Sequence, residues 1–421
     1  MKHLLLIVIL ALLTITGNAQ EEETISFVPT YHQPDGNRIV AGHGTFPNVT
    51  QADVPLFSTP AWILGMQIGT DPVWTVTLED GHIQGVYPLE GTYQPTEAFT
   101  NQLPAGMPPV LKTNGDGAMI VFDLPAGIAP YTHPVYTTNR EVFILQDGSV
   151  MLFGTDWREI AQLSVNAQPD GRIVLNQDGL AALYVGATNQ RYVHGIMGDD
   201  LEGVSLLIFD LEDGRTVGSV DLTGDSVFEG LSPIWADVNG DGVQDLITTA
   251  SNGAAGAQIR VYQSNGELLA QGVPIGQGGR WRHQLAWGAF GANGENLLVE
   301  VLTPHIGGIV GFYRYDGAGN MEIIAQLSGY TSHVINSRNL DMVVAGDFDG
   351  DGQLEIVLPS QDRTRIAGLA LNDNNEIVEK WSLPLDGVLV TNLSAVTLED
   401  GTLALAAGVQ TDTGNVLRLW R

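Results

Sequence analysis

Short stretches in which apolar and polar residues alternate recur along most of the chain, separated by turn signals such as Asp-Gly and Asn-Gly. Alternation with a period of two predicts β-strands, and two such runs joined by a tight turn predict a β-hairpin. Each hairpin is interpreted as the outer pair of strands of one sheet. Because extended helical periodicity is absent, we predict an all-β protein. The predicted hairpins are Val73–Glu79 with His82–Leu89, Glu141–Gln146 with Ser149–Gly154, Val204–Leu211 with Arg215–Leu222, Gln258–Gln263 with Glu267–Gly272, Ile309–Tyr315 with Met321–Leu327, and Ile366–Leu371 with Ile377–Leu383.

Two near-identical acidic turns lie between apolar, β-branched runs, and the second begins 110 residues after the first. Each turn carries oxygen-bearing side chains at its first, third, fifth and ninth positions and a glycine at its sixth. Hard cations such as Ca²⁺ bind about six to eight oxygens, so this spacing predicts two calcium sites. An EF-hand is excluded, because Leu358 stands where the twelfth-position Glu would be and the flanks predict strands. The side-chain ligands are Asp237, Asn239, Asp241 and Asp245 in the first turn, and Asp347, Asp349, Asp351 and Glu355 in the second.

A weaker copy of the same pattern, from Trp287 to Leu298, lies between the two acidic turns and has lost most of their oxygens. The three copies imply a repeat of about 55 residues, which is the size of a propeller blade. Counting such units along the chain gives seven, so we predict a β-propeller with seven blades of four antiparallel strands. The last unit has only three predicted strands, so an N-terminal strand near Thr24–Val28 is predicted to pair with Val416–Trp420 and close the ring.

The N-terminal region and the composition indicate where the protein works. Residues 1–19 have a charged start, a short apolar run and small residues at the end, which predicts an export signal peptide. Residues 20–56 are interpreted as a polar linker with a possible closing strand, and residues 57–421 as the propeller. The chain has no cysteine and a net charge of −30, so disulfides are excluded and nucleic-acid binding is disfavoured. We expect a monomer in a bacterial envelope or medium, without a transmembrane segment in the mature chain.

The acidic turns and their flanking strands resemble FG-GAP/VCBS repeats, the calcium-binding blades of integrin-α-type propellers. The resemblance is strong over 234–250 and 344–360, weaker over 287–302, and only architectural elsewhere. It implies that the backbone carbonyls of Val243 and Gln353 complete the two sites. It also implies that the bound calcium is structural, bracing the turn between the first two strands of a blade.

A second candidate site lies on the opposite face. Successive turns of an up-and-down blade alternate between its faces, so the second turns and the blade-to-blade links lie opposite the acidic turns. Arginine pairs with both oxygens of a carboxylate, so basic and aromatic residues on this face suggest an anionic ligand such as an acidic glycan or a protein segment. The alternative is that these arginines pair with nearby carboxylates such as Asp199, Asp200 and Glu202. The candidate residues are Arg280, Trp281, Arg282, His283, His305, Tyr330, His333, Arg338, Arg363 and Arg365.

Catalysis has weak support in the sequence. A Gly-x-Ser-x-Gly elbow, a His-Glu-x-x-His motif and a phosphate loop are all absent. A binding or scaffold role is therefore favoured over an enzyme. The alternative is a lyase-like enzyme that degrades acidic polysaccharides, which needs a base and a group that neutralises the substrate carboxylate. Tyr330, His333, Arg282 and Arg338 are the residues that could supply them.

Overall fold

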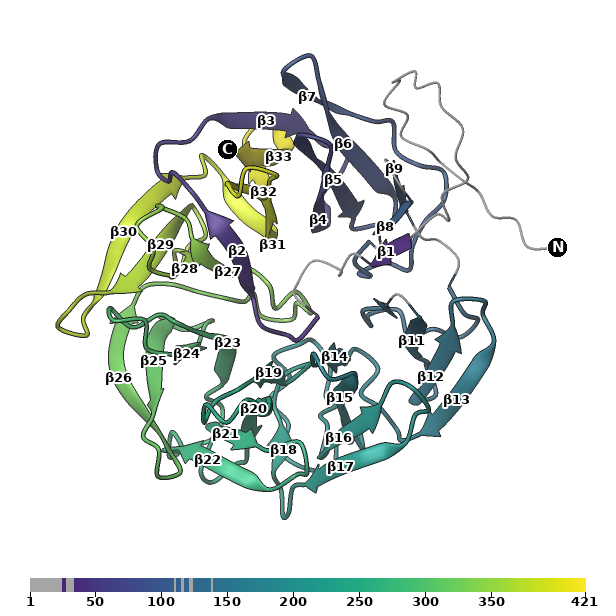
Figure 1. Ribbon diagram of the computed structural model, residues 1–421, viewed down its shortest axis with the longest axis vertical. Helices are drawn as coiled ribbons and strands as arrows, with labels where there is room; N and C mark the ends of the chain where they lie inside the picture. The colour runs from purple at the N-terminus through teal and green to yellow at the C-terminus, as the bar shows by residue number, and fades with distance from the viewer. Residues whose placement is uncertain (1–24, 28–33, 110, 115–116, 121–123, 138) are drawn as a thin grey trace.

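The structure is a computed structural model that describes residues 25–27, 34–109, 111–114, 117–120, 124–137 and 139–421. Over these ranges the named elements are all β-strands, which confirms the all-β prediction. Figure 1 shows the sheets arranged in a ring around a central axis. None of the described segments forms a helix with the length and apolarity needed to cross a membrane. The predicted signal peptide, residues 1–19, lies outside the described residues.

In the part of the chain that the structure describes, seven antiparallel units follow one another around the ring, and each is built mainly from consecutive strands (Figure 1). The fourth and fifth units join into one sheet through a short parallel pairing of their outer strands. The units are β4 (Pro60–Ile68), β5 (Asp71–Leu78), β6 (Ile83–Leu89) and β7 (Thr92–Pro95); β10 (Val135–Tyr136), β11 (Arg140–Ile144), β12 (Ser149–Gly154) and β13 (Glu159–Ser164); β14 (Val174–Leu175), β15 (Leu180–Val185), β16 (Ser205–Asp210) and β17 (Thr216–Asp221); β18 (Val227–Phe228), β19 (Ile234–Ala236), β20 (Asp245–Ser251), β21 (Gln258–Tyr262) and β22 (Leu268–Gly272); β23 (Arg282–Gly288), β24 (Leu297–Leu302), β25 (Ile309–Tyr315) and β26 (Asn320–Ser328); β27 (Val344–Asp347), β28 (Glu355–Pro359), β29 (Arg365–Leu371) and β30 (Ile377–Pro384); and β31 (Val388–Thr397), β32 (Leu403–Thr411) and β33 (Gly414–Trp420) with β3 (Gln51–Pro55).

A smaller sheet accompanies these seven units. It consists of β1 (Ile25–Phe27), β8 (Leu111–Asn114) and β9 (Gly117–Ile120) in the order β1-β8-β9. Figure 1 places it between the β4–β7 and β10–β13 units. Within the described residues there is therefore one sheet more than the seven blades predicted from the sequence.

The six predicted hairpins are all present as adjacent antiparallel strands. Four of them, β16–β17, β21–β22, β25–β26 and β29–β30, are the outer pair of their unit, as predicted. The other two, β5–β6 and β11–β12, are instead the middle pair, because a further outer strand follows each of them. The residues of each turn thus indicate which two strands pair. The position of that pair within its sheet depends on additional strands, in which the alternation of apolar and polar residues is weaker.

The predicted closing strand was wrong. The segment Ile25–Phe27 pairs with β8, and the strand that pairs with β33 is β3. Polar groups fix this pairing, because Asp53 accepts two hydrogen bonds from the Arg418 guanidinium, at 2.7 and 2.5 Å. Val54 alone of the five β3 residues is fully buried, at 2% exposure. One apolar position in five is a weak strand signal, which explains why the sequence pattern favoured the more apolar Thr24–Val28.

The segment between residues 34 and 46, interpreted from the sequence as a linker, is part of the ring. Its strand β2 (Ile39–His43) pairs in parallel with β27, the innermost strand of the sixth unit. Figure 1 shows β2 running from the centre of the ring towards that unit. The preceding backbone is held by two other inner strands, since the Pro34 and Asp35 carbonyls accept hydrogen bonds from Leu175 and Trp235.

The apolar core lies between neighbouring units as well as within them. One cluster, for example, joins Leu285 and Phe312 of the fifth unit to Ile356 and Leu369 of the sixth, all with 0% exposure. Both faces of most inner strands are buried in this way, so each unit is stable only beside its neighbours.

A candidate metal site and the opposite face

The second acidic turn, between β27 and β28, brings its four carboxylates together. Ligand atoms of Asp347, Asp349, Asp351 and Glu355 all lie within 4.8 Å of one another. The backbone aims them, because Gly352 N–H donates to Asp347 Oδ2 at 3.1 Å and Phe348 N–H donates to Glu355 Oε2 at 2.6 Å. The other oxygens of these two side chains, Asp347 Oδ1 and Glu355 Oε1, are buried without a hydrogen-bond partner.

The arrangement fits a hard divalent cation better than it fits bare carboxylates. Burial and the nearby charges of Asp349 and Asp347 raise the pKa of Glu355 to about 9. The ammonium of Lys380 contacts Asp351 and lies 3.4 Å from Asp349, and it lowers the pKa of Asp351. The two buried oxygens have no hydrogen-bond partner even with Lys380 beside the turn. The four side chains that converge there offer carboxylate oxygens, which are ligands that Ca²⁺ prefers.

The first acidic turn, between β19 and β20, has a different internal structure. Both oxygens of Asp237 accept backbone hydrogen bonds, from Gly240 at 2.7 Å and Gly242 at 3.0 Å. Asn239, which replaces a carboxylate of the second turn, donates its amide to Asp241 at 3.0 Å. Burial raises the pKa of Asp245 to about 7. Over the described ranges, 347–355 is the one place where three or more acidic or histidine side chains converge as metal ligands would, so the first turn does not repeat that geometry.

On the opposite face, four of the predicted residues surround one another. Trp281 is 1% exposed and stacks on His283, with ring centroids 4.6 Å apart and planes inclined by 16°. His305 and His333 contact the same indole at 6.2 and 5.3 Å. Burial lowers the pKa of His305 to about 4 and that of His333 to about 3, so both rings are neutral at pH 7. We call Trp281, His283, His305 and His333 the Trp281 cluster.

The predicted arginines do not join this cluster as free charges. Arg282 is buried and donates to Glu300 at 2.5 Å and to the Tyr313 hydroxyl. The remaining ones are held similarly: Arg338 by Asp170 at 3.0 Å and Asp199 at 2.6 Å, Arg365 by Glu379 at 2.7 Å, and Arg363 by the Leu389 carbonyl at 2.8 Å, while Arg280 is half-buried. Pairing within the protein, the alternative that the sequence left open, therefore describes most of them.

The lyase alternative gains no support from this geometry. Its arginines, Arg282 and Arg338, are paired with different carboxylates. The hydroxyl of Tyr330 donates to Glu379 at 2.5 Å, and His333 lies between His305 and the Ser337 carbonyl. Each side chain is thus engaged by a different partner rather than presented together to a substrate.

Sequence reasoning missed a buried ionic network near the ring centre. Asp341 is 1% exposed and accepts hydrogen bonds from Arg38 at 2.8 Å and from Arg172 at 2.7 Å. Arg38 comes from the N-terminal segment and also donates to the Leu285 carbonyl at 2.9 Å. These residues lie 303 and 169 positions apart in the chain, and no local pattern marks them.

A buried carboxyl next to this network provides a pH-dependence prediction. Burial, together with the carboxylates of Glu229, Asp170 and Asp199, raises the pKa of Glu202 well above its ordinary value. A carboxyl that titrates higher in the folded chain than in the unfolded chain lowers stability as pH rises from its unfolded pKa, about 4.5, towards the folded value. Glu202→Gln is therefore expected to be more stable than wild type at pH 8, with a difference that shrinks at pH 5.

Urea unfolding at both pH values, with calcium held constant, measures this difference. Glu267→Gln, at an exposed position, is the matched control and should show the same difference from wild type at both pH values. A Glu202→Gln effect independent of pH would contradict the prediction.

This chain resembles known proteins in its fold. No protein-family model matches the sequence, and no curated protein matches it. Solved structures do match: a europium-containing methanol dehydrogenase has a TM-score of 0.61 at 8% identity, covering 93% of this chain and 98% of its own. Quinohemoprotein alcohol dehydrogenase from Comamonas testosteroni scores 0.56 at 10% identity, covering 93% and 80%, and BamB from Moraxella catarrhalis scores 0.52 at 10%, covering 89% and 97%.

The chain is a β-propeller. These matches span nearly its whole length, and the ring of radial sheets in Figure 1 agrees with them. The propeller predicted from the repeat length is thereby confirmed as a fold. Identities of 8–10% carry no information about chemistry, so the activities of those proteins say nothing about this propeller.

Proposed function

We propose that this propeller is an exported, calcium-stabilised binding or scaffold module of the FG-GAP/VCBS type. The observation that carries the proposal is the convergence of four carboxylates in the 347–355 turn, two of which hold buried oxygens without a partner. Bare carboxylates at this separation repel one another, and a divalent cation removes the repulsion. Asp347, Asp349, Asp351 and Glu355 would hold the ion, with the carbonyl of Gln353 as the further ligand that the resemblance implies.

Calcium in this turn would stabilise more than one blade. The Asp347 carbonyl accepts a hydrogen bond from Gly44 N–H at 2.7 Å, and the Phe348 carbonyl accepts one from Phe46 N–H at 2.9 Å. Phe46 packs on Trp381 at 4.9 Å and on Phe348 at 5.4 Å. The turn therefore anchors the segment that runs from β2 to the closing strand β3, so an ion bound there would stabilise the closed ring.

The test is a thermal unfolding series with calcium and with chelator. Calcium at about 100 times its dissociation constant is expected to add about 2.7 kcal/mol to the free energy of unfolding, because it binds the folded chain alone. Asp349→Asn together with Glu355→Gln should remove this gain. Lys380→Gln should raise the calcium affinity, since it removes a competing positive charge.

Two further variants test whether the calcium effect is specific to the 347–355 turn. Asp316→Asn, in the exposed turn of the β25–β26 hairpin, is the matched control and should keep the full calcium effect. Asp241→Asn reports whether the first acidic turn holds a second ion, which would appear as a second, weaker binding step in calorimetry. A melting temperature that is the same in calcium and in chelator would rule out the calcium proposal.

A protein partner is the better-supported ligand class for the face opposite the metal turn. Val193, Ile306 and Ile335 are 41%, 72% and 57% exposed there. Their loops are tied together, because His305 bonds His333 at 2.6 Å and Asn336 N–H donates to the Ile196 carbonyl at 2.8 Å. Exposed aliphatic side chains on a fixed surface favour a protein partner. An acidic glycan would need arginine charges, and those of Arg282, Arg338 and Arg365 are already paired with carboxylates.

A further inference from the structure

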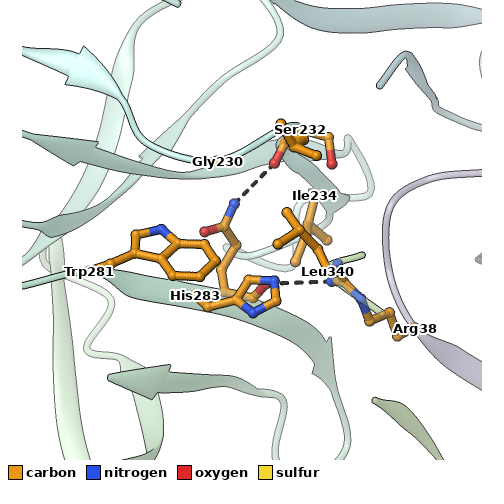
Figure 2. Close-up of a pocket in the computed structure, with 9 residues that line it drawn as sticks. Arg38, Gly230, Ser232, Ile234, Trp281, His283 and Leu340 are labelled. Atoms are coloured by element: carbon orange, nitrogen blue, oxygen red, sulfur yellow. Dashed lines mark hydrogen bonds between the residues drawn. The ribbon is translucent and has the colours of Figure 1, made fainter. Parts of the chain in front are cut away.

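A cleft of about 850 Å³ lies where the last unit of the ring meets the first, and ligand sites typically measure about 300–1,000 Å³. Figure 1 shows β3, the outer strand of the last unit, next to β7 of the first. By contrast, the cavity drawn in Figure 2, beside Trp281 and His283, measures about 10 Å³ and has room for no more than one water molecule. The cleft at β3 is therefore the candidate site for a larger ligand.

The free edge of β3 borders this cleft. Thr50 and Arg421 exchange two backbone hydrogen bonds, at 2.6 and 3.0 Å, so they form a hydrogen-bonded pair at the start of the β3–β33 ladder. Such pairs alternate along an antiparallel ladder, so the backbone groups of Ala52 face β33, whereas those of Gln51 and Asp53 point away from it. Gln51 and Asp53 both line the cleft, and within the described residues no strand pairs with that side of β3. Their N–H and C=O groups are thus available to a ligand.

Apolar side chains form another part of the lining. Val54, Trp74 and Leu419 line the cleft and belong to the apolar cluster that joins the last unit to the first. Leu89, at the end of β6, also lines the cleft and is 48% exposed. The cleft is therefore an opening into the core between two units, and an apolar side chain of a ligand that enters it is removed from water.

The charged residues that line the cleft are mostly acidic, namely Asp53, Asp71 and Glu90 against Arg421. Asp71 pairs with Arg421, and Asp53 pairs with Arg418. Glu90 is exposed in the turn between β6 and β7, and no described residue forms an ion pair with it. A basic side chain of a ligand therefore finds a partner here, whereas an acidic side chain would be repelled.

We propose that this cleft binds an extended segment of another polypeptide in which apolar and basic side chains alternate. The segment would pair its backbone with the free groups of Gln51 and Asp53, as in recognition by strand addition. Successive side chains of a strand point to opposite sides, so the apolar ones would enter the opening beside Leu89 while the basic ones stay at its acidic rim. The proposal is independent of the calcium turn and of the exposed aliphatic surface described above, because it uses none of their residues.

Residue-resolved hydrogen exchange tests the backbone pairing, with a short peptide of alternating valine and lysine as the probe. The peptide should slow exchange of the Gln51 and Asp53 amides by about tenfold or more, because both amides become hydrogen-bonded. The Ala52 and Val54 amides are internal references, since they already donate to β33 in the free protein. Unchanged exchange at Gln51 and Asp53 in the saturated complex would overturn the proposal. So would a peptide-free dimer in gel filtration in which these two amides are already protected, because a second copy would then occupy the cleft.

Fluorescence anisotropy at about 0.15 M salt tests the chemistry of the segment. A peptide with glutamate in place of lysine, and one methylated on the backbone nitrogens that face β3, should each bind about tenfold or more weakly. Glu90→Lys should weaken binding of the lysine peptide to a similar extent. Glu267→Lys is the matched control, since Glu267 is exposed and does not line the cleft, and it should leave the affinity unchanged. Equal affinities for the lysine, glutamate and methylated peptides would contradict the proposed recognition.

Discussion

Replacing Asp341 with asparagine is expected to lower the free energy of unfolding by about 3–5 kcal/mol. Asparagine keeps the shape of the side chain but removes the negative charge that the buried guanidiniums of Arg38 and Arg172 both contact. Urea unfolding of the full chain measures the change. Arg38→Met should cost less, because the Asp341–Arg172 pair remains neutral.

Asp210→Asn is the surface control for this experiment. Asp210 pairs with Arg215 at 3.2 Å, and the two side chains are 30% and 62% exposed. Exposed pairs contribute about 0–1 kcal/mol, so a small effect is expected there. An Asp341→Asn effect equally small would mean that the central network contributes little to stability.

A chain that starts at residue 57 is expected to lose cooperative folding altogether. It lacks β2 and β3, so the inner edge of β27 and the outer edge of β33 are left without their partners. Arg418, which is 3% exposed, also loses both of its bonds to Asp53. Circular dichroism and gel filtration should show an aggregating chain with no sharp thermal transition, whereas residues 34–421 should unfold cooperatively.

Adding a peptide of residues 34–56 in trans provides the second arm of this experiment. It should restore a thermal transition to the 57–421 chain, because β3 binds by strand addition to an exposed edge. A truncated chain that unfolds like the full protein would show that the closing strand is dispensable.

Local chemistry made much of this fold predictable. Asp-Gly or Asn-Gly turns mark five of the six hairpins and Asn374-Asn375 marks the sixth, so all six could be located from the sequence. The 347–355 turn was predictable for the same reason, since all of its ligands lie within nine positions of one another. The first turn shares that spacing, but Asn239 directs its amide at Asp241, and a pattern of residue types does not show that internal hydrogen bond.

Contacts between distant segments explain what the sequence could not show. Arg338 binds carboxylates that lie 168 and 139 positions away in the chain. The sequence predicted that such arginines form a basic face, whereas in the structure Arg338 forms ion pairs within the protein. Asp341 and Arg38 are 303 positions apart. β3 pairs with β33 over all five of its residues, but its single buried valine gives almost no periodic signal.

The joining of the first and last segments affects how the chain is made. Arg418 is synthesised 365 residues after its partner Asp53, so the final sheet cannot form until nearly the whole chain has been made. During synthesis, the earlier sheets therefore form an open arc whose two ends expose strand edges. Contacts of such long sequence separation make folding slow, and an open arc invites pairing with a neighbouring copy. The yield of folded protein should therefore depend on keeping these ends apart from other copies until β33 has been synthesised.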